Sequence, residues 1–162
     1  MITPLPCQIR FAHIDEWDEA MALAWKTFLA YVAPVYLPEG VKSFESFIND
    51  VTLKRMFTTG EYLMMVAIHE KELIGIVTLR DMTHISLLFV DERYHFRGVG
   101  RALVARLCQH LGKETGEKRV TVNAAPYGVE FYRRIGFRKT GPETVSDGIK
   151  YTPMEIRFQR DI

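Results

Sequence analysis

The chain has 162 residues, of which 48% are hydrophobic and 25% charged, which supplies apolar material for one core and not for two. Its 21 basic and 20 acidic residues leave a net charge of +1. The chain therefore has no excess of positive charge of the kind that binds DNA or RNA, and no nucleic-acid partner is expected. We therefore expect one domain spanning residues 1–162.

The N-terminal part predicts a strand followed by a long amphipathic helix. The strand covers Gln8–Phe11, and the helix covers about Ile14–Val32, with apolar residues at helical spacing and acidic residues on the opposite side. Lys26 and Pro34 interrupt the most apolar stretch, so it does not predict a membrane span, and no membrane partner is expected.

A second helix is expected after Ser43, because serine is favoured at helix N-caps. Four apolar side chains of this helix should turn inward: Phe44, Phe47, Ile48 and Val51. The proline-containing stretch Ala33–Gly40 is expected to be a loop between the two helices.

The middle of the chain predicts a hairpin, a strand and a helix in succession. Tyr62–Ile68 and Leu73–Leu79 form the hairpin around Glu70 and Lys71, and the apolar run Ile85–Val90 forms the next strand. A helix then runs from Gly98 to about Leu111, and the remaining chain contains a strand, a short helix and further strands.

A glycine-containing loop joins that strand to that helix and has the features of an anion site. Its sequence is His95-Phe96-Arg97-Gly98-Val99-Gly100-Arg101-Ala102. A helix N-terminus has unpaired N–H groups, two glycines allow close approach, and two arginines add positive charge, all of which suits a pyrophosphate. The alternative is a plain strand-to-helix turn. A dinucleotide fingerprint would need a third glycine at Leu103, and a P-loop would need Lys-Ser/Thr after Gly100.

A second block follows at residues 120–137. A strand ends near Asn123, Pro126 suits the first turn of a short helix, and Gly136 suits the position after its end. The helix finishes in Phe131-Tyr132 followed by Gly136-Phe137.

Together the two blocks resemble the GNAT superfamily of acetyl-CoA-dependent N-acetyltransferases. The first resembles its pyrophosphate loop, Gln/Arg-x-x-Gly-x-Gly/Ala, but His95 replaces Gln or Arg, and Phe96 stands where a glycine is often found. The second matches at Asn123 and in the Phe-Tyr-x-x-x-Gly-Phe string. The resemblance implies a single α/β domain with a mixed, mostly antiparallel central sheet flanked by helices, and acetyl-CoA as cofactor.

The resemblance also implies a set of cofactor-binding positions. These are Leu88, Phe89, Val90, His95, Phe96, Arg97, Gly98, Val99, Gly100, Arg101, Ala102, Asn123, Pro126, Val129, Phe131 and Tyr132. A backbone N–H near Leu88 or Phe89, on a strand that splays from its neighbour, would stabilise the charge that develops on the acetyl oxygen.

Two side chains are candidates for proton transfer during direct attack of an amine on the thioester. Tyr132 would protonate the departing thiolate, although its spacing with Val129 and Ile135 also fits a core tyrosine. His84 would act as the base, since an imidazole titrates near neutral pH; the alternatives are ordered water, Glu92 and Ser86.

The acceptor is expected to be a primary amine of a small molecule or peptide. Tyr31 and Tyr36, with Pro34, Pro38 and the loop to Val41, should shape its pocket. The competing interpretation is a CoA-binding sensor or interaction module without catalysis, which the departures in the glycine loop favour. A ligand-free interaction domain would require both motif blocks to be accidental.

The cysteine and histidine pattern predicts no metal site. Cys7 and Cys108 are not spaced with the histidines as metal ligands, and two cysteines suit a reducing compartment. Because the N-terminus also has no signal-peptide pattern, a cytoplasmic location is expected. The oligomeric state stays open between a monomer and a homodimer.

Overall fold

The computed structural model describes residues 4–158, which are built around an eight-stranded sheet. The strands are β1 (Gln8–Phe11), β2 (Leu63–His69), β3 (Glu72–Arg80), β4 (His84–Val90), β5 (Arg119–Ala124), β6 (Arg138–Lys139), β7 (Thr144–Ser146) and β8 (Ile149–Arg157). Their order is β1-β2-β3-β4-β5-β8-β6, with β7 paired to β8. All pairs are antiparallel except β4–β5, which confirms the expected mixed, mostly antiparallel sheet.

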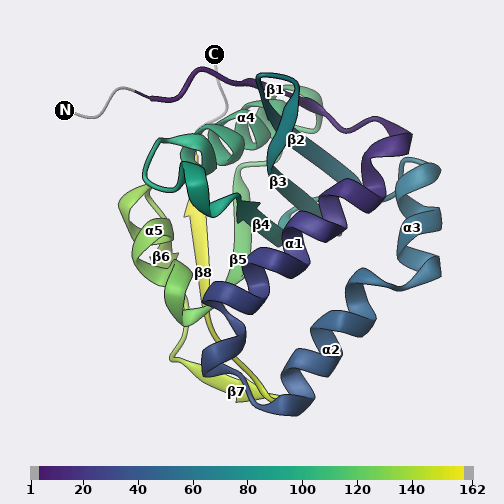
Figure 1. Ribbon diagram of the computed structural model, residues 1–162. Coiled ribbons are helices and arrows are strands. Elements are labelled where there is room, and N and C mark those ends of the chain that lie inside the picture. The colour runs from purple at the N-terminus through teal and green to yellow at the C-terminus, as the bar shows by residue number, and fades with distance from the viewer. Residues whose placement is uncertain (1–3, 159–162) are drawn as a thin grey trace.

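Five α-helices accompany the described strands. They are α1 (Trp17–Tyr31), α2 (Pro38–Ile48), α3 (Val51–Thr58), α4 (Val99–Glu114) and α5 (Val129–Arg134). Single 3-10 turns occur at Ile14–Glu16, Ala33–Val35, Glu92–Tyr94 and Pro126–Gly128. Figure 1 shows α1 crossing the sheet on the side of α2 and α3. Within residues 4–158, no helix combines the length and apolar character needed to cross a membrane.

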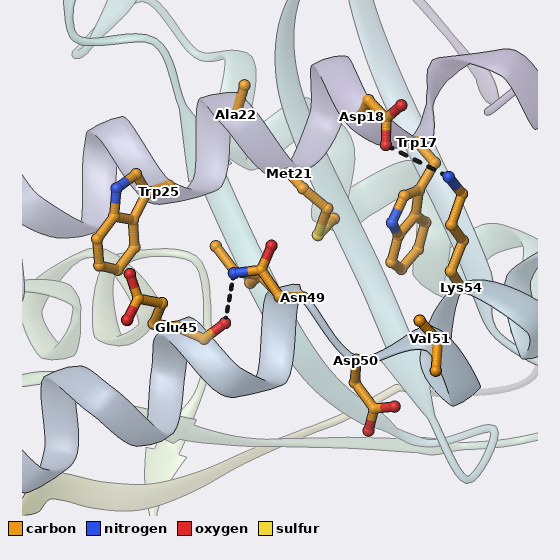
Figure 2. Close-up of a pocket in the computed structure, with 11 residues that line it drawn as sticks. Trp17, Asp18, Met21, Ala22, Trp25, Glu45, Asn49, Asp50, Val51 and Lys54 are labelled. Carbon is orange, nitrogen blue, oxygen red and sulfur yellow. Dashed lines mark hydrogen bonds and ion pairs between the residues drawn. The ribbon is translucent and has the colours of Figure 1, made fainter.

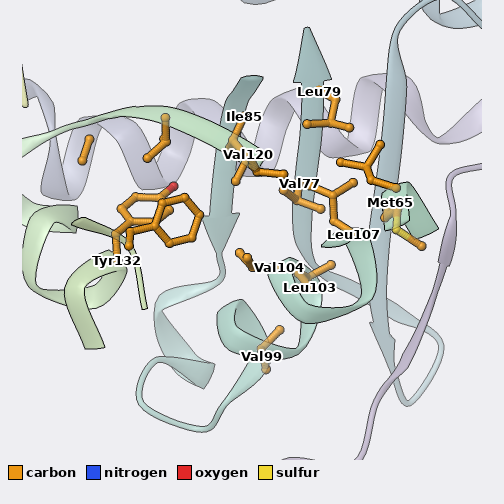
Figure 3. Close-up of a cluster of buried hydrophobic side chains, with 14 of the residues drawn as sticks. Met65, Val77, Leu79, Ile85, Val99, Leu103, Val104, Leu107, Val120 and Tyr132 are labelled. Carbon is orange, nitrogen blue, oxygen red and sulfur yellow. The ribbon is translucent and has the colours of Figure 1, made fainter. Parts of the chain in front are cut away.

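The two faces of the sheet carry separate hydrophobic clusters. One cluster joins α4 to the sheet, where Leu103 and Leu107 pack against residues such as Met65 and Val77 (Figure 3). The other joins α1 and α3 to the opposite face and includes Trp17. Because both faces are covered, the central strand β3 is buried from Leu73 to Leu79, and the middle of the sheet is a rigid support for the loops at its edges.

The predicted hairpin, the strand before the glycine loop and the helix after it are confirmed within a few residues. The second helix was predicted wrongly. It begins at Pro38, because proline is preorganised for the first helical position, and Ser43 lies inside it, donating its hydroxyl to the Glu39 carbonyl at 2.9 Å. Pro38–Gly40 are therefore helical and do not belong to a loop that reaches Val41.

A second correction concerns the end of that helix. The chain leaves it at Asn49, and the Asp50 carboxylate then accepts a hydrogen bond from the Thr52 N–H at 2.8 Å, which caps the start of α3. Val51 follows this cap at the first position of a new helix. It is 74% exposed, so its predicted inward orientation is wrong.

Candidate active site

A gap opens in the sheet between β4 and β5. The two parallel strands pair only at His84–Thr121 and Ile85–Val122 and then separate, whereas β3 continues to pair with β4 up to Val90. A register shift between Thr78 and Leu79 accompanies the divergence on the β3 side. Backbone groups on the second half of β4 therefore face the gap without a partner strand.

The direction of these backbone groups follows from the register. The Asp91 N–H donates to the Ile74 carbonyl across the β3 side, and N–H directions alternate along a strand. The N–H of Phe89 thus points to β3 as well, while those of Leu88 and Val90 point into the gap. Of the two donors suggested by the sequence, the geometry selects Leu88 and assigns Phe89 to the sheet.

The glycine loop lies at the open end of the gap, immediately before α4. Gly98 is the N-cap of α4 with φ +83°, and Phe96 is also left-handed at φ +62°, so the backbone curls around the helix N-terminus. A Cβ on Gly100 would lie 3.0 Å from the Phe131 ring, so only glycine fits there without displacing that ring. Open N–H groups in a concave loop fit the diphosphate of CoA.

Two arginines add positive charge to this loop. Arg97 and Arg101 are both exposed, and neither forms an ion pair with another residue of the described part of the chain. Their guanidinium groups are therefore available to a phosphate. Val99 is buried and Ala102 half-buried, so these two members of the predicted set contribute backbone and packing.

Buried Asp91 fixes the start of the loop. Its carboxylate accepts hydrogen bonds from the Arg93 backbone and guanidinium and forms an ion pair with Lys26 of α1 at 3.3 Å. The hydrogen bonds from Arg93 hold the pKa of Asp91 down at about 2. On the other side of the loop, the Leu5 N–H donates to the Arg97 carbonyl at 3.0 Å.

His95, the residue that departs from the family pattern, bridges the open end of the gap. Its Nε2 donates to the Val90 carbonyl at 2.7 Å, since a carbonyl only accepts, and its Nδ1 lies 3.3 Å from the Tyr127 hydroxyl. Tyr31 packs against both rings, with centroid distances of 5.0 Å to His95 and 4.8 Å to Tyr127. Sequence reasoning missed Tyr127, because its partners His95 and Tyr31 are distant in the chain and no local pattern indicates the contacts.

Tyr132 lies in the cluster on the α4 face of the sheet (Figure 3) and is 6% exposed. Its ring packs edge-on against Phe131 and Phe137 at 5.2 and 5.1 Å. Within residues 4–158 its hydroxyl has no hydrogen-bond partner. Every side-chain oxygen that is fully buried in this part of the chain does have one, so the Tyr132 hydroxyl is not fully buried. Burial raises the pKa of Tyr132, so the phenol keeps its proton at neutral pH.

His84 lies at the closed end of the gap, where β4 and β5 still pair. Its Nδ1 is 2.8 Å from the Thr121 hydroxyl, and its Nε2 has no hydrogen-bond partner among the described residues. Burial, and secondarily the charge of Arg80, lower the pKa of His84, so its imidazole is neutral near pH 7. Its neighbour Ile85 belongs to the same cluster as Tyr132, and side chains alternate along a strand, so His84 projects from the opposite face of the sheet.

The other predicted residues surround the gap. Asn123 is exposed at the end of β5, one residue beyond the last pair with β4. Pro126 and Val129 begin the 3-10 turn and the helix that follow β5. Tyr36 is half-buried, edge-on to Phe28 with a centroid distance of 5.5 Å.

A separate groove of about 550 Å³ runs between α1 and the α2–α3 pair (Figure 2). Trp17, Met21 and Trp25 line its α1 side, and the ion pair between Asp18 and Lys54 spans 3.5 Å across it. None of the predicted site residues lines this groove, and it contains no glycine loop or open strand. The glycine loop and the open edge of β4 both lie at the gap between β4 and β5.

Comparison with known proteins agrees with this architecture. A crystal structure of a GCN5-related N-acetyltransferase from Rhodopseudomonas palustris superposes with a TM-score of 0.82 at 22% identity, covering 98% of this chain and 99% of that one. The N-acetyltransferase PaiA from Thermoplasma acidophilum, solved with coenzyme A, gives a TM-score of 0.71 at 18% identity over 95% and 100%.

Sequence comparison leads to the same group of proteins. Serotonin N-acetyltransferase of Mesocricetus auratus is 31% identical over 74 residues, which are 46% of this chain and only 35% of that relative. The family model described as an acetyltransferase (GNAT) domain matches residues 32–158, most of the chain and both motif blocks. On this match, with the split sheet and the glycine loop in place, the chain belongs to the GNAT acetyltransferase family.

Proposed function

We propose that the chain transfers the acetyl group of acetyl-CoA to a primary amine by direct attack. The observation that carries this proposal is the gap between β4 and β5, which has open N–H groups on one strand and the glycine loop at its mouth. Acetyl-CoA, when bound, supplies an activated thioester; the residues described above bind, orient and exchange protons with it.

The binding part of the proposal assigns the diphosphate to the loop between Phe96 and Ala102. Its N–H groups point out of the N-terminus of α4, where the helix dipole is positive, and Arg97 and Arg101 supply full charges. The N–H groups of Leu88 and Val90 face the gap, so they can hydrogen-bond to carbonyl oxygens placed beside β4, including one that gains charge during transfer.

The proton chemistry requires both a base and an acid. An alkylamine with a pKa near 10.4 is neutral about once in 2,500 molecules at pH 7, which costs roughly 4.6 kcal/mol unless a base removes the proton. His84, which is neutral and whose Nε2 has no hydrogen-bond partner in the described part of the chain, is the proposed base, directly or through water. Tyr132, whose protonated hydroxyl has no hydrogen-bond partner within residues 4–158, is the proposed acid.

The acceptor, a small molecule or a peptide, is proposed to have an apolar part next to its amine. Four aromatic side chains line the α1 face beside β4: Phe89, Phe44, Phe28 and Tyr36. Such a wall favours an apolar body over a strongly polar one. The similarity to a serotonin N-acetyltransferase over 74 residues supports the same class of amine.

The direct test is acetyl-CoA consumption with a panel of primary amines, followed as free thiol release, alongside calorimetry with CoA. Transfer to at least one amine, with tight CoA binding, is the expected result. CoA binding without transfer to any amine would instead identify a catalytically inactive CoA-binding module. The hydrogen bond of His95 to the Val90 carbonyl, inside the gap, is the feature that favours this alternative.

A further inference from the structure

Two glycines from distant parts of the chain meet at the end of the α1–α2 connection. Gly40 lies in the first turn of α2, Gly148 lies in the turn between β7 and β8, and both are buried. A Cβ on Gly40 would lie 2.7 Å from the Gly148 carbonyl carbon, and a Cβ on Gly148 would lie 2.6 Å from the Gly40 nitrogen. No side chain fits between the two backbones.

A hydrogen bond fastens the same contact. The Leu37 N–H, just before α2, donates to the Gly148 carbonyl at 3.1 Å. Gly148 has φ +79° and follows Asp147 with φ +53°, so the β7–β8 turn holds its carbonyl toward α2 by a conformation that glycine adopts without strain. The α1–α2 connection and the β7–β8 hairpin are thus joined backbone to backbone.

The Gly40–Gly148 contact lies at the open end of the gap. The last pair between β5 and β8 is Ala124–Thr152, so Ile149–Tyr151 extend past the end of β5 and pair with β7 instead. Because β4 runs parallel to β5, this is the end at which the two strands diverge. Figure 1 shows β7 beside the start of α2, below the lower end of α1.

Aromatic side chains connect the Gly40–Gly148 contact to the gap. Phe89 on β4 packs edge-on against Phe44 at 5.9 Å, Phe44 stacks on Phe28 at 3.9 Å, and Phe28 contacts Tyr36 at 5.5 Å. Tyr36 directly precedes Leu37. The wall of the gap on the α1 face therefore continues without a break into the segment that the Gly148 carbonyl holds.

We propose that the Gly40–Gly148 contact determines acceptor specificity by holding the α1–α2 connection against the β7–β8 hairpin. It closes the acceptor side of the gap into an arch with an aromatic wall, which admits a slim free amine and excludes the main chain that surrounds a lysine in a peptide. The inference rests on the proposed amine acetyltransferase function and narrows its substrate to small molecules.

Two variants break the contact in different ways. Gly148→Ala places a methyl group against the Gly40 nitrogen, and Gly116→Ala is its matched control, because Gly116 has a similar φ of +73° with no atom within 4 Å of its Cβ. Leu37→Pro removes the N–H donor and replaces a side chain that is 54% exposed. Proline fits the backbone there, because Leu37 has φ −74° and the residue before it is extended at φ −99°, ψ 153°.

The measurement is kcat/KM for 2-phenylethylamine and for an N-terminally blocked octapeptide with a single lysine. In both contact variants the ratio of the amine value to the peptide value should fall by roughly fivefold or more, through KM for the amine, while the dissociation constant of CoA stays that of the parent. Gly116→Ala should keep the parental ratio. Circular dichroism and thermal unfolding establish that each variant is folded, and either variant alone is a sufficient test.

An unchanged ratio in a folded contact variant of an active parent would overturn the role of the contact and leave the amine acetyltransferase proposal standing. A parent protein with a higher kcat/KM for the peptide than for 2-phenylethylamine would also overturn the role of the contact and leave the amine acetyltransferase proposal standing. A parent that binds CoA but acetylates neither these probes nor any amine of the panel would overturn the proposed function itself, so the two failures are distinguishable.

Discussion

Tyr132→Phe separates the chemical role of this tyrosine from its structural one. The substitution keeps the ring, and with it the edge-on contacts to Phe131 and Phe137 at 5.2 and 5.1 Å. Because the hydroxyl has no hydrogen-bond partner within residues 4–158, its removal breaks no bond in that part of the protein. The free energy of unfolding should therefore change by less than about 1 kcal/mol.

Turnover should change much more. Loss of a positioned acid typically costs about 10²-fold, equivalent to roughly 2.7 kcal/mol of transition-state stabilisation. The assay is free thiol release at saturating acetyl-CoA and amine, with CoA affinity from calorimetry expected to stay at the parental value. Since burial raises the pKa of Tyr132 above its ordinary value, the parental rate should not fall as pH approaches 10.

A second buried tyrosine supplies the control. The Tyr62 hydroxyl donates to Thr78 at 2.7 Å and also bonds to Ser86, so Tyr62→Phe should lower the free energy of unfolding by about 1–3 kcal/mol with little change in turnover per folded molecule. The reasoning is refuted if Tyr132→Phe keeps parental turnover while a pre-steady-state measurement shows that CoA release is not limiting. In that event the tyrosine is structural and water supplies the proton.

Three further predictions test the other parts of the site. Gly98→Glu should abolish CoA binding measured by calorimetry, whereas Gly60→Glu, at nearly the same φ (+85° against +83°), should not; equal binding by both would remove the loop as the diphosphate site. His84→Ala should lower kcat most near neutral pH and recover partly at high pH, where the amine deprotonates itself, and a uniform loss across pH would contradict the role as base. Asp91→Asn should cost about 2 kcal/mol of stability at pH 7, because the pKa of Asp91 is about 2 in the folded protein against an ordinary value of 3.8. This contribution is present above about pH 4 and lost toward pH 2, so the urea unfolding curves of parent and variant should converge over that interval; a constant difference would show that the charge is not its source.

The elements that sequence reasoning predicted well are those whose signals are local. The glycine loop, the strand before it and the helix after it follow from an apolar run, two glycines and helical spacing within about twenty residues. The hairpin around Glu70 and Lys71 has the same local character, and both residues adopt the left-handed conformation that a two-residue turn requires.

What could not be predicted depends on partners far away in the chain. Pro38 and Gly40 read locally as loop residues, and only the packing of the Gly148 backbone explains a buried glycine in the first turn of a helix. The divergence of β4 from β5 depends on pairing between strands that are over thirty residues apart. The choice of Leu88 over Phe89 as a donor depends on the register of β4 against β3, which includes an irregularity between Thr78 and Leu79. Single-sequence patterns carry no information on such pairings.

The division of the sheet has a consequence for stability. Only two residue pairs join β4 to β5, so β1–β4 form one hydrogen-bonded ribbon, while β5–β8 form another. The ribbons depend on α4 and the shared core for their cohesion. A ligand in the gap would add the hydrogen bonds that a missing strand would make, and would tie the ribbons together. Occupancy of the gap then stabilises the whole fold by mass action, by about 2.7 kcal/mol at a ligand concentration a hundredfold above its Kd, so the melting temperature should follow CoA concentration.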